Sequence, residues 1–317
     1  MISVELKGGV VKEFENGTTP AEIAKSIGAG LYKSVCCAKV DGDLCDLRTP
    51  LEKDCKVELL TFDNVDGQKT FWHTASHVLA QAVKRLYPNA KCAIGPAVDN
   101  GFYYDFDVEK PFSPEDLEKI KAEMKKIVKS GLELERVELS PEEAEKKLEE
   151  MNEPYKVELV KEHSDKGEHI TFYKQGEFID LCAGPHLMSV APIKAIELTA
   201  CTGAYWRGDA NNAQLCRVYG VAFPKASMLE EYLKKLEEAK LRDHNKLGRE
   251  LEYFTTVDYV GQGLPILLPK GARVVQLLQR WVEDVEQSKG CLLTKTPLLA
   301  KRDLYKISGH WDHYLDG

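Results

Sequence analysis

The sequence lacks a long apolar segment and the cysteine pattern of a secreted protein. Nine of its 317 residues are cysteines, an odd number; Cys36 and Cys37 are adjacent, and no C-x-x-C pair occurs. This usage argues against a disulfide framework and is typical of a reducing compartment. The N-terminal segment MISVELKGGVVKEF carries charges where a signal peptide has an apolar core. Since no apolar run approaches the ~18 residues of a membrane span, we expect a cytoplasmic protein without membrane contact.

The sequence also lacks an excess of positive charge, low-complexity segments and a phosphate-binding loop. Its formal net charge is −8, which excludes a globally basic nucleic-acid-binding protein but not a local basic face. The P-loop pattern G-x-x-x-x-G-K-[ST] is absent. Hydrophobic residues make up 43% of the chain, so large cores can form, and the length suits roughly two to three domains.

Residues 1–62 form the first expected module, and their pattern indicates a β-grasp-like fold. A short helix, AEIAKSI, should open at Thr19-Pro20 and stop at Gly28. The turn Asp41-Gly42 should end one of the strands. The predicted strands are ISVEL, VVKEF, KSVCCAKVDG and KVELLTF.

Residues 63–224 form a second, larger module in which strands alternate with helices, so a mixed α+β domain is expected. A strong helical pattern runs from about Thr70 to Tyr87. Capping boxes at Ser113 and Ser140 open two further helices. The predicted strands are FYYDFDV, ITFYKQG, AIELTAC and CRVYGVAF.

The rest of the chain is predicted to hold a connecting helix and the beginning of a third domain. The helix spans 225–247, with a capping box from Ser227 to Glu230 and a stop at Gly248. Residues 248–317 then show a long helical pattern that leads to a strand ending at Thr296-Pro297. Because this domain opens so close to Gly317, we expect the sequence to contain only part of it.

Two histidines are spaced to lie on one side of the predicted helix 70–87. His73 and His77 are four residues apart, about 40° around the helix axis, whereas the apolar residues from Phe71 to Leu86 cluster on the opposite side. Two solvated surface histidines are one interpretation. The other is a cleft in which both imidazoles aim at one point, where they can bind zinc or relay protons.

The segment FIDLCAGPHL holds a second group of polar side chains. It brings together Asp180, Cys182 and His186, with a turn at Gly184-Pro185. Cys182 and His186 are ordinary metal-ligand types, and with the two helical histidines they would complete a set of four. Taken alone, the segment is better explained by a buried cysteine and an aspartate that caps a turn.

Together these segments resemble a known family. H-x-x-x-H followed about a hundred residues later by C-x-x-x-H is similar to the editing domain shared by threonyl- and alanyl-tRNA synthetases. The stretches IGPAVDNGFYYDFD, YKQGEFIDLCAGPHL, GAYWRGDANNAQLCRVYGVAF and LRDHNKLGRELEYF resemble the threonyl branch, in its order along the chain. FENGTTPAEIA and AKVDGDLCDL resemble a TGS domain, and the segment from GQGLPILLPKGARVV to TKTPLL resembles motif 1 of class II synthetases.

The resemblance implies a TGS domain at 1–62, an editing domain at 63–224, a linker helix at 225–247 and the start of a class II catalytic domain at 248–317. It implies binding of threonine tRNA, hydrolysis of tRNA mischarged with serine, and a full-length homodimer joined through the motif 1 region. The family uses ATP with Mg²⁺ and one zinc in its synthetic site, whose ligands we expect beyond Gly317. We therefore expect this chain not to attach threonine to tRNA, and its editing site to need no cofactor.

The resemblance also assigns the site residues. His73 and Lys156 would position water and transfer protons, and Asp180 would orient the ammonium or hydroxyl of the amino acid. Without it, Lys156 in YKVELV would be interpreted as an exposed lysine. Two alternative functions stay open: a zinc-dependent aminoacyl-tRNA deacylase and a non-catalytic tRNA-binding fragment. The implied pocket residues are His73, His77, Lys156, Asp180, Cys182 and His186.

Overall fold

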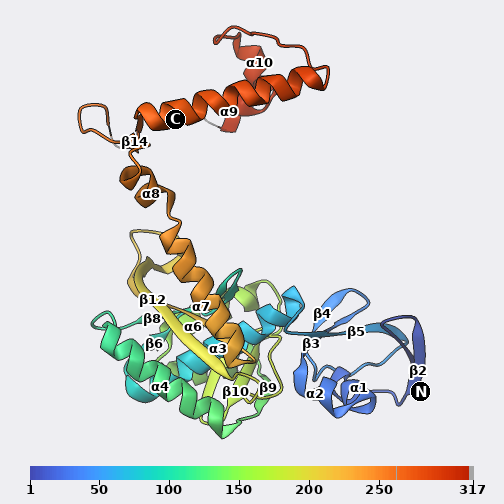
Figure 1. The fold of residues 1–317 in the computed structure, drawn as a ribbon. Helices are drawn as coiled ribbons and strands as arrows, with labels where there is room; N and C mark the ends of the chain where they lie inside the picture. The colour runs from blue at the N-terminus through green and yellow to red at the C-terminus, as the bar shows by residue number, and fades with distance from the viewer. Residues whose placement is uncertain (262, 314–317) are drawn as a thin grey trace. The chain divides into compact units, whose positions relative to one another are not determined.

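The computed structural model describes residues 1–261 and 263–313, and the chain divides into two compact units, Met1–Lys234 and Lys235–Gly317. In the first unit several β-sheets are combined with helices (Figure 1), which confirms the predicted multidomain α+β class. Within the described ranges, no helix combines the length and the apolar character that crossing a bilayer requires.

The N-terminal module is a five-stranded sheet in the order β2-β1-β5-β3-β4, in which β1 and β5 are parallel. Helix α1 begins as predicted, because the Thr19 hydroxyl accepts a hydrogen bond from Glu22 N and Pro20 occupies the first turn. The sequence patterns do not predict α2 and β4, which are too short to establish a period. The elements are β1 (Ile2–Leu6), β2 (Val10–Phe14), α1 (Pro20–Ile27), α2 (Ala29–Ser34), β3 (Val35–Val40), β4 (Asp43–Cys45) and β5 (Cys55–Thr61).

The second module contains two sheets, ordered β12-β13-β8-β6 and β11-β10-β9, and β7 pairs with β8. The capping boxes predicted at Ser113 and Ser140 are present at the starts of α4 and α5. The elements are α3 (Val65–Leu86), β6 (Lys91–Cys92), β7 (Ala97–Val98), β8 (Gly101–Asp107), α4 (Pro114–Ser130), β9 (Leu134–Glu138), α5 (Pro141–Glu150), α6 (Pro154–Asp165), β10 (Thr171–Gln175), β11 (Phe178–Leu181), β12 (Ala195–Tyr205) and β13 (Gln214–Phe223).

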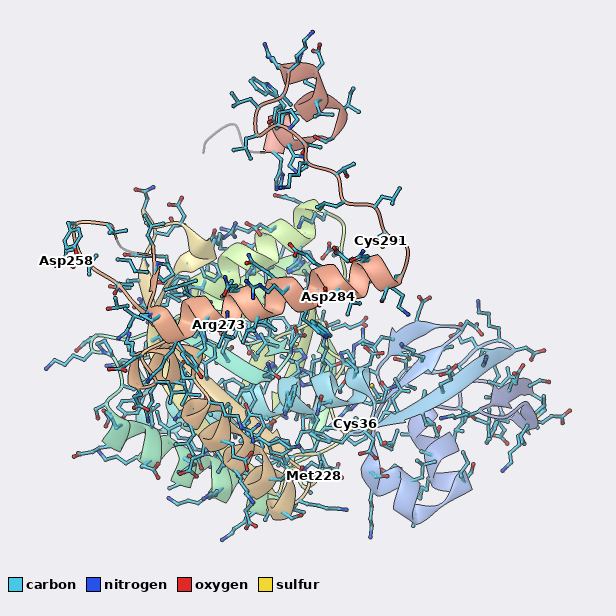
Figure 2. All side chains as sticks on the ribbon, turned by 45° about the horizontal axis from the view of Figure 1, so that its top comes forward. Cys36, Met228, Asp258, Arg273, Asp284 and Cys291 are labelled. Atoms are coloured by element: carbon cyan, nitrogen blue, oxygen red, sulfur yellow. The ribbon has the colours of Figure 1, made fainter. Side chains whose placement is uncertain are left out.

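Helix α3 is the central element of the second module, and it begins five residues earlier than predicted, where Asn64 caps it by accepting from Asp66 N. It is buried through most of its length. The Trp72 indole donates to the carbonyl of Ala222 on β13 at 2.8 Å. Cys36 lies where β3 meets α3 (Figure 2) and belongs to the core formed by α3, α4 and the larger sheet. This core fixes the helix that carries the two histidines.

The predicted helix 225–247 is wrong as a single element. The structure has α7 (Ala226–Leu241) and α8 (His244–Glu250), because the Asp243 carboxylate accepts from Lys246 N and starts a new helix. Helix α7 begins at Ala226, so Ser227 lies inside it. Gly248 does not end a helix either: it is buried in α8, where a Cβ would overlap the ring of Phe254.

In the rest of the second unit the predicted long helix is present as α9 (Pro269–Ser288), on which Figure 2 shows Arg273 and Asp284. The strand predicted to end at Thr296-Pro297 is wrong, since residues 291–300 form no strand in the described structure. An extended segment needs a neighbouring edge for its backbone hydrogen bonds, and no described strand pairs with it. The remaining elements are β14 (Phe254–Thr255), β15 (Ile266–Leu267), α10 (Arg302–Ile307) and α11 (His310–His313).

The close approach of α3 to β5 generates a stability prediction. A Cβ at Gly67 on α3 would overlap the backbone carbonyl oxygen of Thr61, so Gly67→Ala should destabilise the first unit by about 1–3 kcal/mol. Urea unfolding followed by circular dichroism measures the change. Gly30→Ala on α2 is the matched control, because its Cβ meets nothing within 4 Å. Equal urea midpoints of unfolding for the two variants would contradict the close packing of α3 on β5.

Candidate active site

Five of the six residues predicted for the site line one cleft of about 280 Å³, and the sixth, His186, packs against them. Helix α3 supplies His73 and His77, α6 supplies Lys156, and β11 with the following loop supplies Asp180 and Cys182. His186 lies behind them, fully buried, in contact with the other imidazoles. The fold thus brings His73 and Cys182, 109 positions apart in the sequence, into contact.

The three imidazoles and the thiol form a compact cluster. The ring of His186 lies 4.2 Å from the ring of His73 and 4.2 Å from that of His77, centroid to centroid. Cys182 Sγ lies 3.2 Å from Nε2 of His73 and 3.2 Å from Nε2 of His186. The interpretation as two solvated surface histidines is wrong, since His77 is only 2% exposed.

A buried ion pair forms one wall of the cleft. Lys156 Nζ lies 2.8 Å from Asp180 Oδ1, and Lys156 is 4% exposed, so its interpretation as an exposed lysine is wrong. Burial opposes both charges, but the two groups offset this by their attraction: the pKa of Lys156 is raised and the pKa of Asp180 is lowered. Both side chains are therefore charged at neutral pH.

Burial acts differently on the imidazoles. It lowers the pKa of His73 to about 4, against an opposing effect of the Asp180 charge. It also lowers the pKa of His186 well below 6.5, and the neighbouring imidazoles add to this effect. At neutral pH both rings are uncharged, so each has one nitrogen that can accept a proton or a hydrogen bond.

Sequence reasoning missed two side chains that hold the site together. The Tyr104 hydroxyl donates to Asp180 Oδ2 at 2.6 Å, and the Thr74 hydroxyl lies 3.2 Å from His186 Nδ1. The alternation of β8 indicates that Tyr104 faces the core, but nothing local indicates a carboxylate there. Thr74 lies between the two helical histidines, where its direction depends on what packs against α3.

The cluster also fits a metal ion. The ligand atoms of His73, His77, Cys182 and His186 lie within 4.8 Å of one another, and His77 Nδ1 is buried without a hydrogen-bond partner. A neutral imidazole and a thiolate are the ligands that zinc prefers. These four residues would hold such an ion, which would supply Lewis acidity to a bound water.

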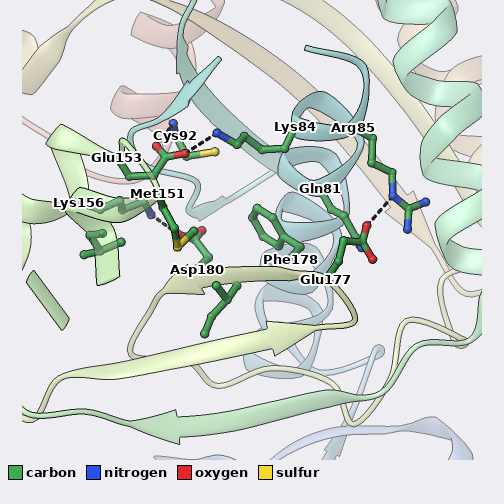
Figure 3. Close-up of a pocket in the computed structure, with 12 residues that line it drawn as sticks. Gln81, Lys84, Arg85, Cys92, Met151, Glu153, Lys156, Glu177, Phe178 and Asp180 are labelled. Carbon is green, nitrogen blue, oxygen red and sulfur yellow. Dashed lines mark hydrogen bonds and ion pairs between the residues drawn. The ribbon is translucent and has the colours of Figure 1, made fainter. Parts of the chain in front are cut away.

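A second cavity of about 180 Å³ adjoins the cleft, since Lys156 and Asp180 line both; Figure 3 shows these two side chains at the second cavity. Its other charged side chains are paired. Lys84 Nζ lies 2.7 Å from Glu153 Oε1, and Arg85 Nε lies 2.6 Å from Glu177 Oε1. Figure 3 shows these pairs on the wall, around the ring of Phe178.

Comparisons with known proteins match a segment in each of the two modules. A profile described as the TGS domain matches residues 2–61, and one described as the threonyl and alanyl tRNA synthetase second additional domain matches residues 170–219. The chain is 60% identical over its full length to a threonine–tRNA ligase of Clostridium perfringens, covering 49% of that protein. Over 99% and 98% of the chain, identity is 52% to the ligase of Acetivibrio thermocellus and 51% to that of Caldanaerobacter subterraneus. The chain spans about half the length of the curated relatives it matches.

The desolvated imidazoles generate a pH prediction. The rings of His73 and His186 should stay neutral between about pH 8 and 5.5 because burial disfavours their charged forms. Ring nitrogen shifts of the ¹⁵N-histidine-labelled chain, assigned with His73→Ala and His186→Ala, measure this. The unfolded chain takes up these protons near pH 6.5, so the free energy of unfolding should fall as the pH drops from about 6.5 to 4. Titration of His73 near pH 6.5 would contradict its burial.

Proposed function

We propose that the chain is part of a threonine–tRNA ligase and that its cleft proofreads by hydrolysing serine from threonine tRNA. The observation that carries the proposal is the cluster of uncharged imidazoles and a thiol beside the buried Lys156–Asp180 pair. Asp180, Cys182 and His186 lie in the segment that matches the second additional domain of threonyl and alanyl tRNA synthetases.

The proposed reaction would compensate for the poor discrimination between serine and threonine that binding alone allows. Serine keeps the hydroxyl of threonine and lacks only one methyl group, and such a difference is worth about 1–3 kcal/mol. That is too little for faithful protein synthesis. A second site that admits the smaller product and excludes the larger one multiplies the discrimination. Here a cleft of about 280 Å³ is the proposed second sieve.

Hydrolysis of the ester needs a water, a proton acceptor and groups that orient the substrate. His73 is the proposed acceptor, because its ring is neutral and borders the cleft. Lys156 is a cation, so it donates a hydrogen bond to hold the water rather than taking its proton. Asp180 orients the ammonium or hydroxyl of the serine, because a carboxylate can accept several hydrogen bonds beyond those from Lys156 and Tyr104.

The remaining three side chains shape the cleft. His77 Nε2 lies 3.7 Å from Asp180 Oδ2 and extends the polar wall. Cys182 Sγ accepts a hydrogen bond from Gly184 N at 3.3 Å, which fixes the loop that bounds the cleft. His186 supports Cys182 from behind. In this proposal a resident metal is not needed.

We predict the deacylation rates of the seryl and threonyl esters of threonine tRNA for the wild-type chain and two variants. The wild-type chain should release serine from threonine tRNA much faster than threonine, since the extra methyl group is excluded sterically. His73→Ala should slow serine release by about 10²–10⁴-fold, the usual contribution of a general acid–base group. His244→Ala on α8, an exposed histidine of the other unit, is the control and should leave the rate unchanged. Release of radiolabelled amino acid gives the rates.

Equal rates on the two esters would refute the steric sieve. An unchanged rate in His73→Ala would refute its role as proton acceptor. A wild-type chain that binds threonine tRNA but hydrolyses neither ester would favour the non-catalytic tRNA-binding alternative.

The zinc-dependent deacylase is the second candidate, because four ligand atoms lie within 4.8 Å. We expect the purified chain to hold much less than one equivalent of zinc and to keep its deacylation rate after dialysis against a chelator. Elemental analysis and the deacylation assay measure both. About one equivalent of zinc, lost together with activity in His77→Ala, would establish the metal-dependent mechanism instead.

The proposed domain organisation, cofactors and partners rest on the similarity of the chain to threonine–tRNA ligases. We propose a TGS domain at 1–62, an editing domain at 63–224, a linker at 225–247 and part of a class II catalytic domain at 248–317, in a cytoplasmic protein that binds threonine tRNA. In the full-length protein, ATP, Mg²⁺ and one zinc would serve the synthetic site, and α9 would contribute to a homodimer interface. The apolar character of α9 supports that interface, because its exposed side chains include Val274, Val275, Leu277, Leu278, Trp281, Val282 and Val285.

A further inference from the structure

Asp46 and Arg48 of the N-terminal module lie against the loop that carries Cys182 and His186. They follow β4, and Asp46 is only 7% exposed. Its Oδ1 accepts from Arg48 N at 2.9 Å and from Arg48 Nη1 at 3.0 Å. Its Oδ2 accepts from the Tyr173 hydroxyl at 2.9 Å and from His186 N at 3.1 Å. One carboxylate thus joins two modules.

Arg48 completes the contact from the other side of His186. Its Nη2 donates to the carbonyl of Leu187 at 2.8 Å, its Nε to that of Leu134 at 3.0 Å and its Nη1 to that of His186 at 3.4 Å. The N–H of His186 is therefore held by a carboxylate and its C=O by a guanidinium. Hydrogen bonds to charged groups are the strong ones, and the planar guanidinium fixes geometry as well as distance.

The held backbone determines where the imidazole lies. His186 is fully buried, and its ring nitrogens contact the Thr74 hydroxyl and Cys182 Sγ, each at 3.2 Å. A shift of the His186 backbone must therefore move the ring away from Cys182 or strain both contacts. Tyr173, also held by Asp46, packs so closely on Gly184 that a Cβ there would overlap its hydroxyl.

An apolar contact supports the same loop. Met188, two residues after His186, packs against the core of the N-terminal module. A buried ion pair by itself is weak evidence for stability, because desolvating two charges offsets their attraction. The pair is better explained by the geometry that it imposes on the loop than by the free energy of joining two modules.

We propose that Asp46 and Arg48 are positioning residues for the cleft, through which the N-terminal module sets the place of His186 and Cys182. The effect on hydrolysis rests on the proposed function, but the effect on the loop does not. Asp46→Asn removes the charge and Arg48→Lys removes the planar fork, so either change should release the loop and expose the Cys182 thiol.

The test measures the reactivity of Cys182 in the 317-residue chain, with a chelator present so that no metal protects the thiol. Alkylation by iodoacetamide is followed peptide by peptide in the mass spectrometer. In Asp46→Asn and in Arg48→Lys, Cys182 should react about threefold faster or more, whereas the buried Cys92 should not change. Asp54→Asn is the matched control, because that carboxylate accepts from Ser3 N within the N-terminal module.

Hydrolysis is measured on the same proteins. Misplacement of reacting groups by about 1 Å can cost on the order of 10²-fold in rate, so kcat for seryl-tRNA should fall about 10–100-fold in Asp46→Asn with KM little changed. Cys182 alkylation at the wild-type rate in both variants overturns the proposal, as does a parallel rise at Cys92, which would mean general loosening. Should the wild type not hydrolyse the ester while Cys182 still responds, the positioning role stands and the proposed function falls.

Discussion

The buried ion pair between Lys156 and Asp180 is the interaction on which the cleft depends. Both side chains are removed from water, so each charge relies on the other and on fixed hydrogen bonds. Removing one partner would leave an uncompensated buried charge, which is far more costly than losing a surface salt bridge. The pair therefore links α6 to β11, and through the Tyr104 hydroxyl it links both to β8.

Around this pair, charged and uncharged side chains lie next to one another. The ion pair supplies a fixed dipole, whereas the imidazoles of His73 and His186 stay neutral because burial lowers their pKa values. Burial opposes all of these charges: Lys156 and Asp180 stay charged because their attraction offsets it, whereas on His73 and His186 burial outweighs the other effects. A hydrolytic site needs both kinds of group, one to orient and one to accept a proton.

Much of the local structure could be predicted from the sequence. The capping boxes at Ser113 and Ser140 and the spacing of His73 and His77 are encoded within a few residues, so the sequence indicates them directly. The break at Asp243 was missed because an N-cap inside a helical pattern competes with continuation of the helix, and only the folded chain decides. The strand predicted before Pro297 failed because a strand depends on a neighbour that periodicity cannot supply. The burial of Lys156 could not be predicted without knowing that it shares a site with Asp180, 24 positions away in the sequence. Only the family resemblance indicated that the two residues share a site.

The contact of Asp46 and Arg48 with His186 has a consequence for how these modules can be exchanged in evolution. In a chain that kept the cleft but lost the N-terminal module, the N–H and C=O of His186 and the Tyr173 hydroxyl would lose these charged partners and face water instead. Water can satisfy their hydrogen bonds, but it does not fix the loop in one geometry as the carboxylate and the guanidinium do. To hold His186 in the same place, a free-standing version of the second module would therefore need its own substitute for the carboxylate and the guanidinium, or a differently folded loop after β11. The two modules are separate in sequence, but the position of His186 depends on both of them.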